Sequence, residues 1–273
     1  MASLTGCLDK MRIAPDSPAQ YQLPLGRLQQ PMNPLLGQTL TLTFTGRIVC
    51  THCQRVTRKS FGQGYCYPCF QRLAQCDSCI LSPEKCHWHL GTCREPDWAQ
   101  QHCHTDHIVY LANASGIKVG ITRASQMPTR WLDQGAIQAL PIARVANRYQ
   151  SGLLEVICKA SVSDKTDWRA LLRGQADLVD LLAARDALYS RIHDSLAELR
   201  ARFPAAVQWL SDESVQSFQY PVTRYPNKVA TLNLDKTPVI EGQLLGIKGQ
   251  YLFFPDGALN IRKFTAYEIT LNY

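Results

Sequence analysis

Four cysteines in the N-terminal third have the spacing of a metal site. Cys50-x2-Cys53 and Cys66-x2-Cys69 form two C-x-x-C turns separated by twelve residues. Each turn directs two sulfurs at one ion, and two such turns complete a tetrahedral four-sulfur shell. We therefore expect a zinc ion here, and because a filled shell leaves no position for substrate or water, we expect it to be structural.

A second set of cysteines follows at less diagnostic spacings. Cys76, Cys79, Cys86 and Cys93 could hold a second zinc ion, and this is the preferred assignment. An iron–sulfur cluster on the same four thiolates is the alternative. Cys7 and Cys158 are expected to be ordinary buried thiols. One ligand of the second site could also be replaced by a neighbouring cysteine or histidine, namely Cys103, His87, His89, His102, His104 or His107.

The segment 109–163 concentrates positive charge, with six Lys/Arg against two acidic residues, in a chain of net charge +7. A basic surface suits phosphate, although a solvated basic face would have the same composition. On a helix beginning near 148, the residues Arg148, Gly152, Glu155 and Lys159 fall on one face. The glycine would let a backbone or a ligand approach closely. The competing interpretation is an Arg148–Glu155 ion pair on a solvent-facing stripe.

Residues 107–160 resemble the GIY-YIG nuclease superfamily. The matching pieces are IVYLA around Tyr110, KVGIT ending near Gly120, Arg130 on a first helix and Glu155 on a second. The resemblance implies that Glu155 holds one divalent cation such as Mg²⁺, that Tyr110 helps to deprotonate the attacking water, and that Arg130 neutralises charge growing on the phosphate.

The segment also departs from that family pattern. Lys118 stands at the place of the second tyrosine, and Ile108 at the place of a glycine. Lysine could bind phosphate, or the change could mark a protein that binds nucleic acid without cleaving it. Lys118 and Arg148 are expected at the rim of the site. A hairpin loop of three or five residues would place Tyr110 and Lys118 on one face of the sheet, whereas two or four would separate them.

Nearly the whole chain resembles a bacterial family described only as a domain of unknown function. The stretches that carry this resemblance are CDSCILSPEKCHWHLGTCREPDW, KVGITRASQMPTRWLDQGA and GIKGQYL. The resemblance implies no activity.

The elements that position these residues can be predicted from periodicity and turn chemistry. Residues 1–35 show little periodicity and are expected to wrap over the surface. Asn113 to Gly116 predicts a hairpin turn, Pro141 suggests an edge strand, and Asn147 is a helix cap. The expected strands are 40–49, 107–112, 117–122 and 137–146, with further short strands in 229–273, and the expected helices are 128–134, 148–160, 164–172 and 176–203. The last helix carries an apolar stripe that should face the core: Leu178, Leu181, Leu182, Leu188, Ile192, Leu196 and Leu199.

Together these features predict an α+β protein. It would combine a zinc-ribbon or treble-clef-like module, a GIY-YIG-like three-stranded sheet with helices, a helical segment, and a small C-terminal antiparallel β domain. The predicted boundaries are 1–106 for a β segment with the zinc module, 107–163 for the GIY-YIG-like domain, 164–210 for the helical segment and 211–273 for the β domain.

The composition predicts a cytoplasmic protein, because eleven cysteines without a secretory signal favour metal thiolates in a reducing compartment. No apolar run is long enough for a membrane span. The leading hypothesis is a zinc-stabilised nucleic-acid-binding protein that acts on DNA or RNA, with metal-dependent nuclease activity as its catalytic form. The alternatives are a non-catalytic module that binds RNA, DNA or protein, and a redox or metal sensor. Oligomeric state is not predicted.

Overall fold

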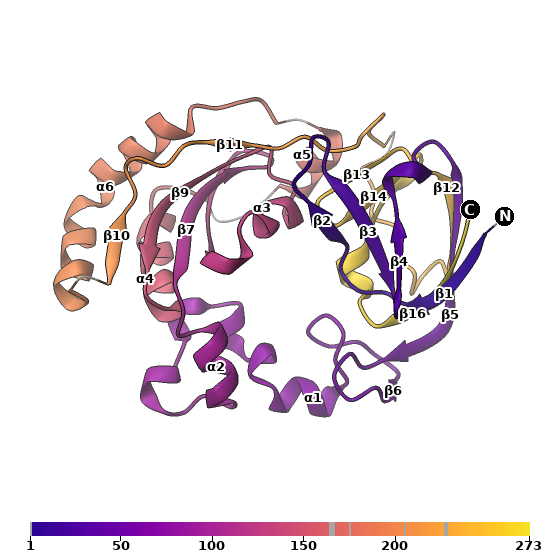
Figure 1. Cartoon of the computed structure of the whole chain (residues 1–273), viewed down its shortest axis with the longest axis horizontal. Helices are drawn as coiled ribbons and strands as arrows, with labels where there is room; N and C mark the ends of the chain where they lie inside the picture. Colours follow the sequence, from indigo (N-terminus) through magenta and orange to yellow (C-terminus); the bar gives the residue numbers. More distant parts are fainter. Residues whose placement is uncertain (1, 164–166, 175, 205, 227–228) are drawn as a thin grey trace.

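The computed structural model describes residues 2–163, 167–174, 176–204, 206–226 and 229–273. The protein has a mixed α/β architecture with four antiparallel sheets. Figure 1 shows a β body built from both ends of the chain on one side, a sheet covered by helices on the other, and the cysteine-rich region joining them below. None of the described helices is long and apolar enough to cross a membrane.

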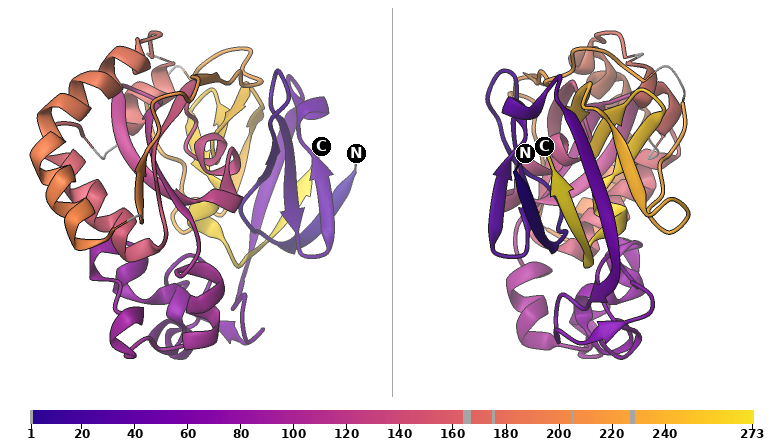
Figure 2. Two further views of the ribbon diagram at one scale, coloured as in Figure 1. Left: turned by 60° about the vertical axis from the view of Figure 1, so that its left-hand side comes forward. Right: turned by 90° about the vertical axis from the view of Figure 1, so that its right-hand side faces the viewer.

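The largest sheet of the β body combines the two ends of the chain. Strand β16 (Tyr267–Asn272) lies between β1 (Ser3–Cys7) and β5 (Thr39–Val49), and β12 (Val239–Gln243) and β6 (Val56–Thr57) also pair with β5. The amide of Ala2 donates to the carbonyl of Tyr273 at 2.8 Å, so the two ends of the chain lie side by side (Figures 1 and 2).

Two three-stranded sheets complete this body around a shared hydrophobic core. They consist of β2 (Arg12–Ala14), β3 (Gln20–Leu25) and β4 (Leu28–Pro31), and of β13 (Gly246–Lys248), β14 (Tyr251–Phe254) and β15 (Gly257–Asn260). The expectation that residues 1–35 only wrap over the surface is wrong. In β3, the buried Tyr21 and Leu23 alternate with the exposed Gln20 and Gln22. The predicted division of the chain into four domains stays a prediction. The first predicted domain (1–106) and the last (211–273) both contribute strands to the largest sheet.

The second large sheet contains the predicted hairpin. Its order is β10 (Val207–Trp209), β9 (Gln138–Val145), β7 (His107–Asn113) and β8 (Ile117–Arg123), and β11 (Gln216–Ser217) also pairs with β9. Asn113 pairs with Ile117, which leaves a three-residue loop. Lys118 pairs with Ala112, two residues after Tyr110, so Tyr110 and Lys118 lie on the same face of the sheet.

Pro141 does not mark an edge strand, because β9 is paired on both sides. On one side the register with β7 shifts between Val109 and Tyr110, where Ile142 is the extra residue of β9 and Pro141 sits opposite Tyr110. On the other side, β10 pairs with residues 143–145 and β11 with residues 138–139, so Pro141 lies in the gap between them. The missing amide hydrogen of proline is therefore tolerated inside a sheet.

The helices near this sheet follow the sequence predictions closely. They are α3 (Thr129–Asp133), α4 (Arg148–Lys159), α5 (Trp168–Arg173) and α6 (Leu181–Arg202). The side chain of Asn147 accepts from the amide of Gln150 and caps α4 as predicted. The described part of the predicted helix 164–172 begins after the cap residue Asp167, while residues 164–166 lie outside the described residues.

Helices α4 and α6 pack against one face of the sheet, and α6 lies on the side away from the β body (Figure 2). Asp180 caps α6, so this helix begins five residues later than predicted. Within the predicted apolar stripe, Leu178 is 76% exposed and Leu182 is 41% exposed. The other five members are buried in the core, as expected: Leu181, Leu188, Ile192, Leu196 and Leu199.

The cysteine-rich region is made of short helices connected by tight turns. It contains α1 (Tyr67–Arg72), α2 (Pro96–His102) and the 3-10 helices η2 (Ala74–Cys76), η3 (Ser78–Ile80), η4 (Pro83–Lys85) and η5 (Trp88–Leu90). The remaining 3-10 helices are η1 (Asn33–Leu35), η6 (Ala124–Gln126) and η7 (Ile261–Phe264). Strand β5 leads directly into this region and α2 leads out of it towards β7, so the region connects the two large sheets.

Candidate functional site

The first cysteine group is assembled as the sequence predicted. Cys50 and Cys53 lie in the turn after β5, Cys66 caps α1, and Cys69 lies in the first turn of that helix. The four sulfurs lie within 4.8 Å of one another, and those of Cys53 and Cys66 are 3.6 Å apart. A tetrahedral zinc ion with Zn–S bonds of about 2.3 Å places sulfurs roughly 3.8 Å apart, so the group fits a structural zinc site.

The protonation of this group also suits a cation. Burial opposes ionisation of Cys50, yet the backbone amides of Cys53, Cys66 and His52 lower the pKa of its thiol to about 6. Burial and the neighbouring thiols raise the pKa of Cys69 to about 12. Without a cation, ionising one thiol therefore opposes ionisation of the next. A divalent ion removes that conflict and allows all four thiolates to form.

The predicted second set of four ligands is not brought together. Among the described residues, Cys76, Cys79, Cys86 and Cys93 do not form a group of mutually close sulfurs. Cys76 packs against the first cysteine group, whereas Cys79 and Cys86 are buried with Cys103. Cys93 packs against this second cluster, and Cys76 and Cys79 enter different clusters although they lie on adjacent 3-10 helices, η2 and η3.

The five residues predicted to form a catalytic site all line one cavity of about 440 Å³. The cavity lies beside β8, the edge strand of its sheet, between α3, α4 and the cysteine-rich region. Residues from both ends of the chain complete its wall. Its predicted members are Tyr110, Lys118, Arg130, Arg148 and Glu155, and its additional charged members are Lys10, Arg123, Asp133, Lys159 and Arg262.

Tyr110 forms the floor of this cavity. Its ring is fully buried, its hydroxyl donates to Oε1 of Gln134 at 3.2 Å, and Arg130 lies close by. A Cβ atom at Gly120 would lie 2.7 Å from the Tyr110 hydroxyl, so the glycine makes room for the ring. Burial raises the pKa of Tyr110. The phenol therefore stays protonated at neutral pH, which opposes the predicted role as a base.

Arg148 is held by the cysteine-rich region, and the competing interpretation, an ion pair with Glu155, is absent from its described contacts. Its Nε donates to the carbonyl of Cys79 at 3.2 Å, and Nη2 donates to the carbonyl of Ile80 at 2.7 Å. Its backbone amide donates to the carbonyl of Cys103 at 2.8 Å. These bonds fix the guanidinium at the wall of the cavity.

Glu155 lies one helical turn before Lys159 and pairs with it at 3.4 Å. It is only 8% exposed. The helix approaches the cysteine-rich loop closely at Gly152, where a Cβ atom would overlap the backbone of Pro83 and Glu84. The predicted purpose of this glycine, a close backbone approach, is therefore confirmed.

Positive charge dominates the cavity. Seven Lys/Arg side chains line it, against the two carboxylates of Asp133 and Glu155. Burial lowers the pKa of Arg123, and the charge of Arg148 adds to this effect. Burial and the charge of Arg130 act in the same way on the pKa of Arg262. The cationic side chains thus destabilise one another, and an anion among them would relieve that repulsion.

Two of the seven cations could not have been assigned to the cavity from local sequence. Lys10 follows β1 and pairs with Asp133 at 2.9 Å, and Arg262 comes from η7 near the C-terminus. They reach the cavity because the paired ends of the chain bring the β body against α3. The sequence contains no local signal for that contact.

Comparison with known proteins places the chain in a family. The model of the family described as "Protein of unknown function (DUF2797)" matches residues 37–269, and the chain belongs to this family. No curated protein and no solved structure matches the chain. The match covers the cysteine-rich region, the sheet that contains β7 to β11, and every cavity-lining residue except Lys10.

Proposed function

We propose that this member of the DUF2797 family binds nucleic acid through its phosphate backbone, in the basic cavity beside β8. The proposal rests on the charge of this concave site, which is lined by seven cationic side chains and only two anionic ones. Each phosphate is an anion that several Lys/Arg side chains can contact together, and release of its counterions adds to affinity. The zinc module, for which we propose a ribbon or treble-clef fold, would hold the loop that positions Arg148.

A second candidate function is cleavage of the bound phosphodiester. It is favoured because Tyr110, Arg130 and Glu155, which match the GIY-YIG pattern, line the same cavity. Mg²⁺ commonly uses one or two carboxylates together with substrate phosphate, so Glu155 fits as its ligand only when nucleic acid is bound. When bound, the ion would supply charge neutralisation at the phosphate. Arg130 would stabilise the developing negative charge, and Tyr110 would donate a hydrogen bond.

The binding proposal is tested with labelled single-stranded, double-stranded and structured nucleic acids at several salt concentrations. Arg130→Ala should weaken binding roughly tenfold at low salt, the effect of losing one charge-assisted contact. The slope of log affinity against log salt should fall by about one contact. Arg191 is an exposed residue of α6, so Arg191→Ala is the matched control. It should leave the affinity and the salt dependence unchanged. Equal affinities of wild type and Arg130→Ala for every nucleic acid would contradict the proposal.

Glu155→Gln separates binding from cleavage. The substitution removes a negative charge from the cavity, so affinity for nucleic acid should be retained or increased. If the protein cleaves, the variant should lose cleavage in the presence of Mg²⁺. Binding without cleavage by the wild type leaves the non-catalytic module as the function.

A further inference from the structure

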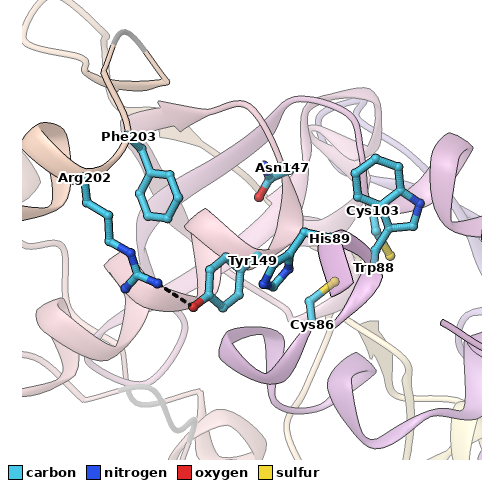
Figure 3. A pocket seen from close by; sticks show the side chains of 8 residues that line it. All are labelled: Cys86, Trp88, His89, Cys103, Asn147, Tyr149, Arg202 and Phe203. Atoms are coloured by element: carbon cyan, nitrogen blue, oxygen red, sulfur yellow. Dashed lines mark hydrogen bonds between the residues drawn. The ribbon is translucent and has the colours of Figure 1, made fainter. Parts of the chain in front are cut away.

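A second group of buried thiols lies behind the basic cavity. Cys79, Cys86 and Cys103 are each no more than 6% exposed and pack in one cluster. They come from η3, from the residue after η4, and from the end of α2. The thiol of Cys86 lies close enough to those of Cys79 and Cys103 to interact with both. Figure 3 shows the sulfurs of Cys86 and Cys103 turned towards each other at one end of an aromatic-lined pocket.

His107 adds an unsatisfied nitrogen near this cluster. It is the first residue of β7, four residues after Cys103, and is completely buried. Its Nδ1 donates to the carbonyl of Thr105 at 2.6 Å, which fixes the tautomer and leaves Nε2 with a lone pair. Nε2 is buried and has no hydrogen-bond partner. A histidine held through Nδ1 by a carbonyl, with Nε2 directed to an ion, is the usual arrangement of a metal ligand.

We propose that Cys79, Cys86, Cys103 and His107 close on a second zinc ion, which would draw together ligand atoms that, in the described residues, do not all lie within 4.8 Å of one another. Three thiolates and one imidazole nitrogen form a common structural zinc set, and they satisfy the tetrahedral preference of the ion. The ion would supply the missing partner of the His107 nitrogen. This set replaces the one expected from spacing, because it exchanges Cys76 and Cys93 for Cys103 and His107.

A competing set shares Cys79 and consists of Asp77, Cys79 and His87, whose ligand atoms lie within 4.8 Å of one another. Its other two members are already engaged. Asp77 pairs with Arg94 at 2.7 Å, and Nε2 of His87 faces the same carboxylate at 3.6 Å. This set offers one sulfur, whereas the proposed set offers three buried sulfurs, which zinc prefers over a carboxylate that already has a cation.

The second ion would have a positioning role. The carbonyls of Cys79 and Cys103, two of its ligands, accept hydrogen bonds from the side chain and the backbone of Arg148. Fixing both cysteines on one ion therefore fixes Arg148 at the cavity wall. The proposal of a second ion does not depend on the proposed function. Only its expected effect on nucleic-acid binding rests on that function.

The test counts zinc ions per chain by native mass spectrometry, with each variant matched to a control. Wild type should hold two ions. Cys103→Ser and His107→Ala should each hold one, whereas Cys93→Ser and His87→Asn should keep both. His107→Cys should restore the second ion, which distinguishes loss of a ligand from misfolding.

Three results of the ion count would overturn the proposal. They are a single zinc ion in the wild type, loss of an ion in Cys93→Ser or His87→Asn, and two ions in both Cys103→Ser and His107→Ala. In the wild type loaded with zinc, X-ray absorption should detect a nitrogen ligand beside the sulfurs, and an all-sulfur signal would also overturn it. Because none of these measurements involves nucleic acid, their failure is distinguishable from failure of the proposed function.

Discussion

Lys248 is a buried lysine in the core of the β body. It is 1% exposed, and its Nζ lies 5.6 Å from the centre of the Tyr220 ring. Burial lowers the pKa of its ammonium group to about 8, below the value of 10.5 that applies in the unfolded chain. Because the unfolded state binds this proton more tightly, the group costs stability below about pH 8 and costs less as pH rises towards 10.5.

We therefore expect Lys248→Met to stabilise the protein at pH 7, by on the order of 2–3 kcal/mol. The gain should shrink steadily between about pH 8 and pH 10, because the wild-type lysine loses its proton in that range. Urea unfolding of both proteins at pH 7, 8, 9 and 10 measures the difference between their free energies of unfolding. The other titrating groups contribute equally to both proteins, so they cancel in this difference. A difference that is constant with pH would show that Lys248 is not held at a lowered pKa.

Individual residues differ in how far the sequence predicts their roles. The cap Asn147 was predicted because a helix cap depends on neighbours within the same helix. The role of Gly152 was predicted because only a residue without a side chain allows such a close approach. Lys10 and Arg262 were not predicted as cavity residues, because they reach the site through strand pairing across the whole chain. Local pattern predicts local chemistry, and a composite cavity needs the tertiary fold.

At the scale of elements, α4 is the contact between the cavity and the cysteine-rich region. Gly152 faces the backbone of Pro83 and Glu84 so closely that a methyl group would overlap it. Gly152→Ala removes the flexibility of glycine but forces the helix and the loop apart. The expected result is a loss of about 1–3 kcal/mol and weaker nucleic-acid binding, because Arg148 on the same helix shifts.

Val156→Ala is the matched control, because Val156 lies on the same helix and is 47% exposed. It should change stability by less than about 0.5 kcal/mol. Thermal or urea unfolding of the two variants measures the difference. Equal stabilities of Gly152→Ala and the wild type would mean that the loop at 83–84 can move away without cost.

The elements predicted well are those stabilised by their own sequence neighbours. The hairpin of β7 and β8 and the helix α4 were found because their turn and cap residues lie inside them. Strand β1 was missed because its partner, β16, lies at the other end of the chain. Strands β2 to β4 were missed although they pair with one another, because they are short and carry glutamine and proline instead of a long apolar alternation. The same limit applies to the cysteines: spacing grouped Cys76 with Cys79, whereas packing places them in different clusters.

At the scale of the whole molecule, strand β5 couples the β body to the first cysteine group. It pairs with β16 along the sheet and runs directly into Cys50. The amide of Val49 donates to the carbonyl of Ala266, one residue before β16 begins. Unfolding of the sheet should therefore also release a zinc ion bound by the first cysteine group, although that group lies outside the sheet.

Ile269→Asp tests this coupling. Ile269 is fully buried in β16, between β1 and β5, so an aspartate there places an unpaired charge in the core. The cost of several kcal/mol is comparable to the total stability of a typical domain. We expect the variant to lose its cooperative thermal transition and to release zinc to a chromogenic chelator that the wild type resists. Thr270→Asp, on the opposite face of the same strand, should keep both properties, because its hydroxyl lies among exposed contacts with Thr5. If the zinc of Ile269→Asp stayed protected while the sheet unfolded, the cysteine-rich region would fold independently of the two ends of the chain.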